Sequence, residues 1–189
     1  METNDLIEVY PNALDAASCR GIIELFERSP AKIPSGTGVT NVLQAARRSQ
    51  GVYLDPQSGG ALFQAALAAL QRSFAEYVAK YEELRQQKSV FESFGIYRYQ
   101  NESEGYDWHS DGMDAGLRYR FVSAVLYLNT VAQGGETEFR YQNRKIPAQE
   151  GTVVLFPSGW THIHRGCPPR SGSKYVLITW TRYADNPML

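Results

Sequence analysis

The chain has 189 residues, of which 43% are hydrophobic and 21% charged, the balance of one ordinary globular domain, so disordered and fibrous classes are excluded. Its 19 basic and 20 acidic side chains give a net charge of −1, so no overall positive field attracts nucleic acid or anionic lipid. The apolar runs, such as 153–156, fall far short of the roughly 20 residues that a membrane-spanning helix needs, and we expect no membrane segment.

The N-terminal sequence and the cysteines bear on the compartment. The opening METNDLIEVY lacks the basic and apolar regions of a secretory signal. Cys19 and Cys167 are two isolated cysteines, which excludes a disulfide framework and a cysteine-rich zinc site. We therefore expect a reducing, cytoplasmic setting.

The first predicted element is a helix. Leu14, Cys19, Phe26 and the pair 22–23 recur at helical spacing, Asp15 or Ser18 is suited to cap the start, and the helix should end near 29–30. The polar stretch 31–51 that follows contains Pro34, Gly36 and Gly38 and predicts a long loop. It fits either a lid over a binding site or a tolerated surface insertion.

A second, longer helix is predicted over about 60–87. Its apolar stripe faces away from a surface rich in Gln, Arg, Lys and Glu, which is typical of a helix packed on a core. The stripe consists of Leu62, Ala65, Ala66, Ala69, Leu70, Phe74, Tyr77, Val78 and Tyr81.

After residue 89 the period changes to that of β-strands. Four runs rich in aromatic and β-branched residues predict strands at 91–99, 119–128, 151–156 and 175–183, separated by turn sequences such as Gly134-Gly135. In the second run, Val122, Ala124, Leu126 and Leu128 should line one face, and the alternate residues from 121 to 127 the other. We expect one domain over 1–189 of class α+β: a helical part over about 1–88, then an antiparallel sandwich or barrel over about 89–185.

The residues most suited to chemistry are the three histidines. His109 and Asp111 are two apart, so in an extended segment both side chains leave one face and can bind one ion. A third ligand must come from His162 or His164. Two histidines and one carboxylate on one face of a metal are the ligand set of non-heme Fe(II) oxygenases. On its own, His-x-Asp is also common as a surface histidine beside an acid.

Further motifs accompany these histidines. They are a Tyr-Leu-Asn strand end at 127–129, a Gly-Gly-Glu-Thr-x-Phe turn at 134–139, a His-x-Gly-x-Pro segment at 164–168, and Lys174, ten residues beyond His164. The single residues Tyr99, Arg120 and Trp180 complete the set. In combination they resemble the Fe(II)/2-oxoglutarate-dependent dioxygenases of the prolyl 4-hydroxylase type, over about 91–182, with a weaker similarity at 47–49. Pro169 departs from the family, which often has valine there.

The resemblance implies a double-stranded β-helix, or jelly roll, with the N-terminal helices packed on one outer face. It implies Fe(II) bound by His109, Asp111 and His164, with His162 as the less favoured ligand. It also implies 2-oxoglutarate and O₂ as cosubstrates, with ascorbate as an optional reductant. Lys174 would pair with the distal carboxylate of 2-oxoglutarate and Tyr127 would donate a hydrogen bond to it.

The implied reaction is decarboxylation of 2-oxoglutarate to succinate and CO₂, coupled to hydroxylation of an unactivated C–H bond. Tyr99 is either a neighbour of the metal-proximal end of the cosubstrate or a core strand tyrosine. Arg120 and Trp180 match positions that face the substrate in prolyl hydroxylases; the alternatives are a surface ion pair for Arg120 and barrel packing for Trp180.

A peptidyl proline in a peptide or protein is the expected substrate, with a free amino acid or another small molecule as the alternative. Nucleic acid is not expected as a partner, and the sequence does not indicate an oligomeric state. Two other classes compete: a non-catalytic jelly-roll binding module, against which the complete ligand set argues, and a zinc hydrolase using the same ligands. The hydrolase leaves the spacing of Lys174 and the Gly-Gly-Glu-Thr turn without a role.

Overall fold

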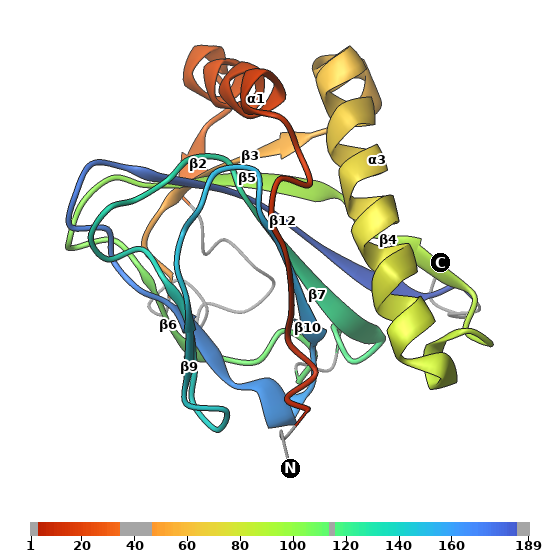
Figure 1. Cartoon of the computed structure of the whole chain (residues 1–189). Coiled ribbons are helices and arrows are strands. Elements are labelled where there is room, and N and C mark those ends of the chain that lie inside the picture. The colour runs from red at the N-terminus through yellow and green to blue at the C-terminus, as the bar shows by residue number, and fades with distance from the viewer. Residues whose placement is uncertain (1–3, 35–46, 114–115, 185–189) are drawn as a thin grey trace.

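The computed structural model describes residues 4–34, 47–113 and 116–184. Within these ranges, the helices α1 (Ala16–Arg28) and α3 (Pro56–Lys80) accompany two antiparallel β-sheets. Both helices lie on the same outer side of the larger sheet, and β6 and β9 of the smaller sheet lie on the opposite side (Figure 1). None of the helices in the described ranges is long and apolar enough to cross a membrane.

The larger sheet has eight strands in the order β1-β10-β7-β12-β5-β3-β2, and β4 pairs with β12 beside this path. Its strands are β1 (Glu8–Tyr10), β2 (Ile33–Pro34), β3 (Gln50–Leu54), β4 (Ser89–Phe91), β5 (Phe94–Tyr99), β7 (Arg120–Tyr127), β10 (Val153–Pro157) and β12 (Lys174–Tyr183). The long β12 pairs with β7 on one side and with β5 on the other, so it lies at the centre.

The smaller sheet has the order β6-β11-β8-β9, with β6 (Tyr106–His109), β8 (Thr137–Phe139), β9 (Arg144–Ile146) and β11 (His164–Gly166). From β6 onward the chain passes repeatedly between the two sheets, with β7, β10 and β12 in the larger one. This winding is a double-stranded β-helix, and the predicted α+β jelly roll with helices on one face is confirmed.

The first helix follows its prediction. The Asp15 carboxylate accepts a hydrogen bond of 2.8 Å from the Ser18 amide at the start of α1, and Cys19, Ile22 and Phe26 are buried. The helix ends at Arg28, followed by Ser29 in extended conformation. An N-cap aspartate satisfies amide groups that have no partner within the helix, which defines where the helix begins.

The second helix begins and ends earlier than predicted. Asp55 caps α3 by accepting hydrogen bonds from the amides of Gln57 and Ser58, and Pro56 occupies the first helical position. Gly60 has a φ of +51° and interrupts the helical backbone there. The helix ends at Lys80, and the expected remainder is replaced by a short 3₁₀ turn, η1 (Glu82–Leu84).

The part predicted as helical, about 1–88, also contains three strands, so that prediction is incomplete. β3 extends the larger sheet by pairing with β5, and β1 pairs with β10 at the other edge. These strands are only two to five residues long, too short for sequence alternation to reveal them. Of the loop predicted over 31–51, β2 and the residues from 47 onward are described, and 35–46 lie outside the described residues.

The two faces of β7 contribute to two cores, as the alternation predicts. Val122, Ala124 and Leu126 pack with the helices, whereas Val125 and Tyr127 belong to the core inside the barrel. The second core ends next to the histidines, because Phe139 and Phe156 pack against His164 with ring centroids 5.8 and 4.7 Å away. The rigid interior of the barrel thus supports one of the candidate ligands directly.

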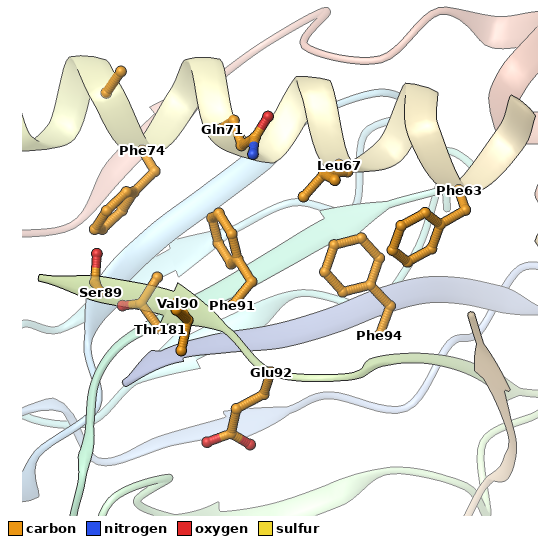
Figure 2. Close-up of a pocket in the computed structure, with 11 residues that line it drawn as sticks. Phe63, Leu67, Gln71, Phe74, Ser89, Val90, Phe91, Glu92, Phe94 and Thr181 are labelled. Atoms are coloured by element: carbon orange, nitrogen blue, oxygen red, sulfur yellow. The ribbon is translucent and has the colours of Figure 1, made fainter. Parts of the chain in front are cut away.

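An apolar groove of about 500 Å³ lies between α3 and β4. The aromatic rings of Phe63, Phe74, Phe91 and Phe94 line it, and Phe63 stacks on Phe94 at 5.1 Å (Figure 2). Glu92, at the end of β4, points away from α3 in the same view (Figure 2). The groove is therefore separated from the barrel interior by the sheet itself.

Candidate functional site

The candidate metal ligands come together in the smaller sheet. His109 is the last residue of β6 and lies directly opposite His164, the first residue of β11. Asp111 follows in the turn after β6, two residues beyond His109, so the extended segment assumed from the sequence ends just before it. One nitrogen or oxygen from each of the three side chains lies within 4.8 Å of the others. This is the geometry that a single small cation requires.

Hydrogen bonds fix the orientation of both imidazoles. Nδ1 of His109 lies 2.8 Å from the carbonyl oxygen of Asp107, and Nδ1 of His164 lies 3.0 Å from that of His162. Each Nδ1 therefore carries a proton and donates it, which leaves Nε2 as the free lone pair. The two Nε2 atoms face the Asp111 carboxylate at 3.5 and 3.6 Å.

The carboxylate of Asp111 is held by a buried chain of hydroxyls. The Ser123 hydroxyl donates a hydrogen bond of 2.6 Å to Asp111, and Ser158 lies 2.8 Å from Ser123. Burial alone would raise the pKa of Asp111, but the imidazole of His164, that of His109 and the Ser123 hydroxyl outweigh it and lower the pKa well below its usual value. Burial, together with His109, lowers the pKa of His164 to about 4. At neutral pH the His164 imidazole is therefore neutral and Asp111 is a carboxylate, and two imidazole ligands with one carboxylate suit a divalent transition metal.

His162 lies outside this set. Its Nε2 is 2.9 Å from the carbonyl oxygen of Asp5 and its Nδ1 is 2.9 Å from the Thr161 hydroxyl. Its ring thus ties the N-terminal segment to the short 3₁₀ turn η2 (Trp160–His162). The arrangement favours His164 as the third ligand.

Lys174 is buried beside the two tyrosines that the sequence singled out. It is 2% exposed, and its ammonium lies 5.4 Å from the ring centroid of Tyr99 and 5.5 Å from that of Tyr127. Burial lowers its pKa to about 8. Within the described residues, no carboxylate lies within ion-pair distance of this ammonium. A buried cation without an anion is costly, so the site fits an anionic ligand such as a carboxylate.

Tyr127 ends β7 with its hydroxyl inside the barrel. The hydroxyl lies 2.6 Å from that of Thr137, and both side chains are buried. Tyr99 pairs with Lys174 across β5 and β12, so its strand position alone brings it next to the amine. These three hydroxyls and the ammonium give one end of the barrel interior its polar character.

The Gly-Gly turn connects this polar end to the segment that carries His164. Gly134 and Gly135 have φ values of +74° and +78°, and a Cβ on Gly134 would lie 2.4 Å from the carbonyl oxygen of Pro168. The Gly135 amide donates to that same carbonyl at 3.0 Å, and the Cys167 amide donates to the carbonyl of Glu136 at 2.8 Å. Only glycine permits this close crossing, which leads into β8 and places the Thr137 hydroxyl against that of Tyr127.

Arg120 and Trp180 lie on the same face of the sheet as the hydroxyl chain. Trp180 is opposite Ser123 across β12 and β7, and a bulge next to it turns Arg120 toward the indole. The Arg120 guanidinium lies 3.6 Å from the Trp180 ring and binds both carboxylate oxygens of Glu92. Arg120 therefore makes an ion pair, as one alternative predicted, but it does so at the site. The indole Nε1 of Trp180 is buried and has no hydrogen-bond partner in the part of the chain that the structure describes.

Sequence reasoning gave Arg47 only a weak signal and missed the role of Tyr106. Arg47 is 8% exposed, and its guanidinium lies 3.5 Å from the ring of Tyr97 and 4.9 Å from that of Tyr106. Its Nε and one terminal nitrogen are buried and have no hydrogen-bond partner among the described residues. Tyr106 stacks on His109 with ring centroids 3.5 Å apart, so the arginine borders the candidate metal centre. Residues three apart in a strand point to opposite faces, so the spacing of Tyr106 and His109 gave no signal; the register irregularity between β6 and β11 accompanies the stacking of the two rings.

Comparisons with known proteins agree with this geometry. Residues 94–182 match the family described as the 2OG-Fe(II) oxygenase superfamily. Prolyl 4-hydroxylase 13 of Arabidopsis thaliana is 26% identical over 208 residues, which cover 95% of this chain and 72% of that protein.

Two solved structures have the same fold. A viral collagen prolyl hydroxylase from Paramecium Bursaria Chlorella virus-1, in its 2OG complex, has a TM-score of 0.73 at 21% identity, covering 96% of this chain and 98% of that one. A prolyl hydroxylase from Trichoplax adhaerens, in complex with a peptide fragment of the hypoxia inducible factor oxygen degradation domain, has a TM-score of 0.76 at 16% identity, covering 95% and 84%.

Proposed function

Because the chain is a member of the 2OG-Fe(II) oxygenase superfamily, we propose that it hydroxylates a prolyl residue within a peptide or protein, with 2-oxoglutarate converted to succinate and CO₂. The observation that carries this proposal is the unpaired ammonium of Lys174, buried in the barrel that also holds His109, Asp111 and His164. A dicarboxylate cosubstrate that also binds the metal would use both the ammonium and the metal ligands, whereas a metal hydrolase would leave the ammonium without a role.

The donor set fits Fe(II), and His109, Asp111 and His164 would hold it. The metal together with 2-oxoglutarate and O₂ supplies the oxidising chemistry; the protein supplies geometry and a shielded pocket. The hydrogen bonds at both Nδ1 atoms keep each Nε2 directed at one point, and Ser123 fixes the carboxylate. With the pKa of Asp111 held low and that of His164 near 4, neither group needs to lose a proton on metal binding at neutral pH.

At the polar end, Lys174 would pair with the distal carboxylate of 2-oxoglutarate. Tyr127 would contribute its hydroxyl hydrogen bond from the opposite side, and Tyr99 would close the pocket next to the lysine. A charge-assisted hydrogen bond of this kind contributes about 1.5–3 kcal/mol. Tyr127 offers a neutral hydroxyl there, because burial raises its pKa.

The substrate side of the pocket offers donors that lack partners within residues 4–34, 47–113 and 116–184. The indole N–H of Trp180 and the two unpartnered guanidinium nitrogens of Arg47 suit carbonyl oxygens of an extended peptide. Arg120 would hold the Trp180 ring as the flat wall against which a pyrrolidine ring packs. A prolyl peptide presents such a ring and unpaired carbonyls on either side of it.

A hydroxylase of a free amino acid is the second candidate, and Arg47 is the observation that favours it. A buried guanidinium with free N–H groups can bind a free carboxylate as well as a peptide carbonyl. Competition between blocked peptides and free amino acids for hydroxylation separates the two candidates.

The experiment uses protein purified without oxygen and supplied with Fe(II), 2-oxoglutarate and air, with ascorbate present or absent. Succinate is measured by mass spectrometry with and without proline-rich peptides and free proline, beside Asp111→Ala. Peptide-dependent succinate together with a mass gain of one oxygen on the peptide supports the proposal. Turnover that only free amino acids stimulate supports the second candidate, and no 2-oxoglutarate consumption under any condition refutes both. The cytoplasmic setting stays a prediction from the cysteines, and ascorbate as an optional reductant stays a prediction from the family resemblance.

A further inference from the structure

Three of the most exposed large hydrophobic side chains belong to segments that hydrogen bonds join around one short turn near the candidate metal centre. In the described residues, four such side chains exceed 60% exposure: Tyr53 at 62%, Met113 and Tyr141 at 63%, and Trp160 at 66%. Tyr53 belongs to β3. Trp160 lies in η2, and Met113 and Tyr141 belong to segments that are hydrogen-bonded to residues in or next to η2.

Backbone hydrogen bonds place these segments together. The Gly112 amide, next to Met113, donates to the carbonyl of Ser158 at 2.9 Å, two residues before Trp160. On the other side, the Arg140 amide donates to the Ile163 carbonyl at 2.9 Å and the Gln142 side chain donates to the Thr161 carbonyl at 3.0 Å. Tyr141 lies between these two anchors. We call Met113, Arg140, Tyr141 and Trp160 the η2 patch.

The patch also carries a guanidinium without an acidic partner. Arg140 is exposed and stacks over Trp108 at 4.6 Å, and within the described part of the chain no carboxylate pairs with it. Arg165, on the same indole at 4.7 Å, is by contrast paired with Glu138 at 2.6 Å. An exposed apolar surface beside a free positive charge fits a partner segment with apolar side chains and one acidic residue.

The patch is continuous with the proposed substrate side of the pocket. A Cβ on Gly112 would lie 3.2 Å from the carbonyl oxygen of Arg120, so the segment leading to Met113 contacts the residue that holds Trp180. Asp111 and Ser158 lie at the same junction, joined through Ser123. The backbone next to Met113 and Trp160 therefore adjoins the residues of the candidate metal centre.

We propose that the η2 patch binds the flank of the substrate polypeptide and selects substrates with apolar and acidic residues next to the hydroxylated proline. The inference rests on the proposed function, since it assigns the substrate side of the same site. Trp160 would be the main anchor, because tryptophans in such surfaces carry a large share of the binding energy. Arg140 would select the acidic residue.

The test compares two peptides that share one central proline. One has flanks of Leu and Asp, the other has flanks of Ser and Lys. We expect kcat/KM to favour the first by about fivefold or more, and Trp160→Ala to remove that preference while leaving the second peptide and the KM for 2-oxoglutarate unchanged. Arg140→Gln should remove only the share of the kcat/KM preference that the Asp residues of the first peptide contribute. Tyr53→Ala removes an equally exposed aromatic outside the patch and is the matched control.

A second measurement separates the patch from the reaction. With 5-fluorotryptophan incorporated and the Trp160 signal assigned by Trp160→Phe, addition of the Leu/Asp peptide should shift that fluorine resonance even if no peptide is hydroxylated. A shift without turnover supports the patch and refutes the proposed function. Turnover in which Trp160→Ala keeps the preference, or in which Tyr53→Ala has the same effect, overturns the patch. A change of oligomeric state in Trp160→Ala assigns the surface to a contact between copies and also overturns it.

Discussion

Replacing Lys174 with methionine removes a single buried charge and keeps a side chain of similar length. The ammonium is 2% exposed and burial lowers its pKa from 10.5 to about 8. Because the folded pKa lies below the unfolded one, the unfolded chain holds more protons between these values, and stability rises with pH across that window. Below about pH 8 the buried charge lowers the free energy of unfolding by its full amount, on the order of 3 kcal/mol.

The substitution should therefore have opposite effects on stability and on cosubstrate binding. At pH 7 and without ligand, Lys174→Met should raise the free energy of unfolding by up to about 3 kcal/mol, because the desolvated charge is gone. The same change removes a charge-assisted hydrogen bond worth about 1.5–3 kcal/mol to 2-oxoglutarate, which weakens its binding roughly 10- to 150-fold. A purely structural lysine would show a loss of stability and no change in binding.

Urea denaturation of the metal-free protein measures the first effect, and calorimetric titration of 2-oxoglutarate into the Mn(II)-loaded protein measures the second. Lys145→Met is the matched control, because the Lys145 side chain is 61% exposed and pairs with Glu138 at the surface. It should change stability by less than about 1 kcal/mol and leave binding unchanged. The reasoning is refuted if Lys174→Met loses more than about 1 kcal/mol of stability or retains wild-type affinity.

Three further predictions follow from the site. The affinity of the wild-type protein for 2-oxoglutarate should decline above about pH 8, where Lys174 becomes neutral, whereas Lys174→Arg should show no such decline in the same calorimetric titration; parallel pH profiles would contradict this. Asp111→Ala should abolish the visible absorption that Co(II) acquires on binding, and retention of that band would remove Asp111 from the ligand set. Gly134→Ala should cost more than about 2 kcal/mol in urea denaturation, whereas Gly172→Ala, which has a similar φ of +75° but open space around its Cβ, should cost only about 1 kcal/mol. Equal losses would show that the crossing at Pro168 does not matter.

The sequence predicted the parts of this fold that are long and strongly patterned. The helix after Asp15 and the two-faced strand β7 follow directly from periodicity, because their apolar residues extend over enough positions to distinguish a period of 3.6 from one of 2. The start of α3 was missed because its apolar stripe begins at Leu62, although Asp55-Pro56 already signals the start. β1, β2 and β3 depend on pairing partners far along the chain, which periodicity does not reveal.

The candidate site was predictable to the extent that spacing determined it. The triad and Lys174 come together because strand register places His109 opposite His164 and Tyr99 opposite Lys174. Arg47 and Ser123 carried no comparable signal, since their importance arises from burial and from contacts with residues distant in sequence. Arg120 pairs with Glu92, as one reading expected, and stacks on Trp180; that it faces the substrate stays a prediction.

The central claim is that one pocket couples oxidation of 2-oxoglutarate to hydroxylation of a prolyl peptide. The most direct test measures succinate and hydroxylated peptide in the same reaction with Fe(II) and O₂. The account predicts equal amounts of the two products, and loss of both in Asp111→Ala. Succinate formed without any hydroxylated peptide would contradict the assignment of the substrate, and failure to consume 2-oxoglutarate with iron bound would contradict the account as a whole.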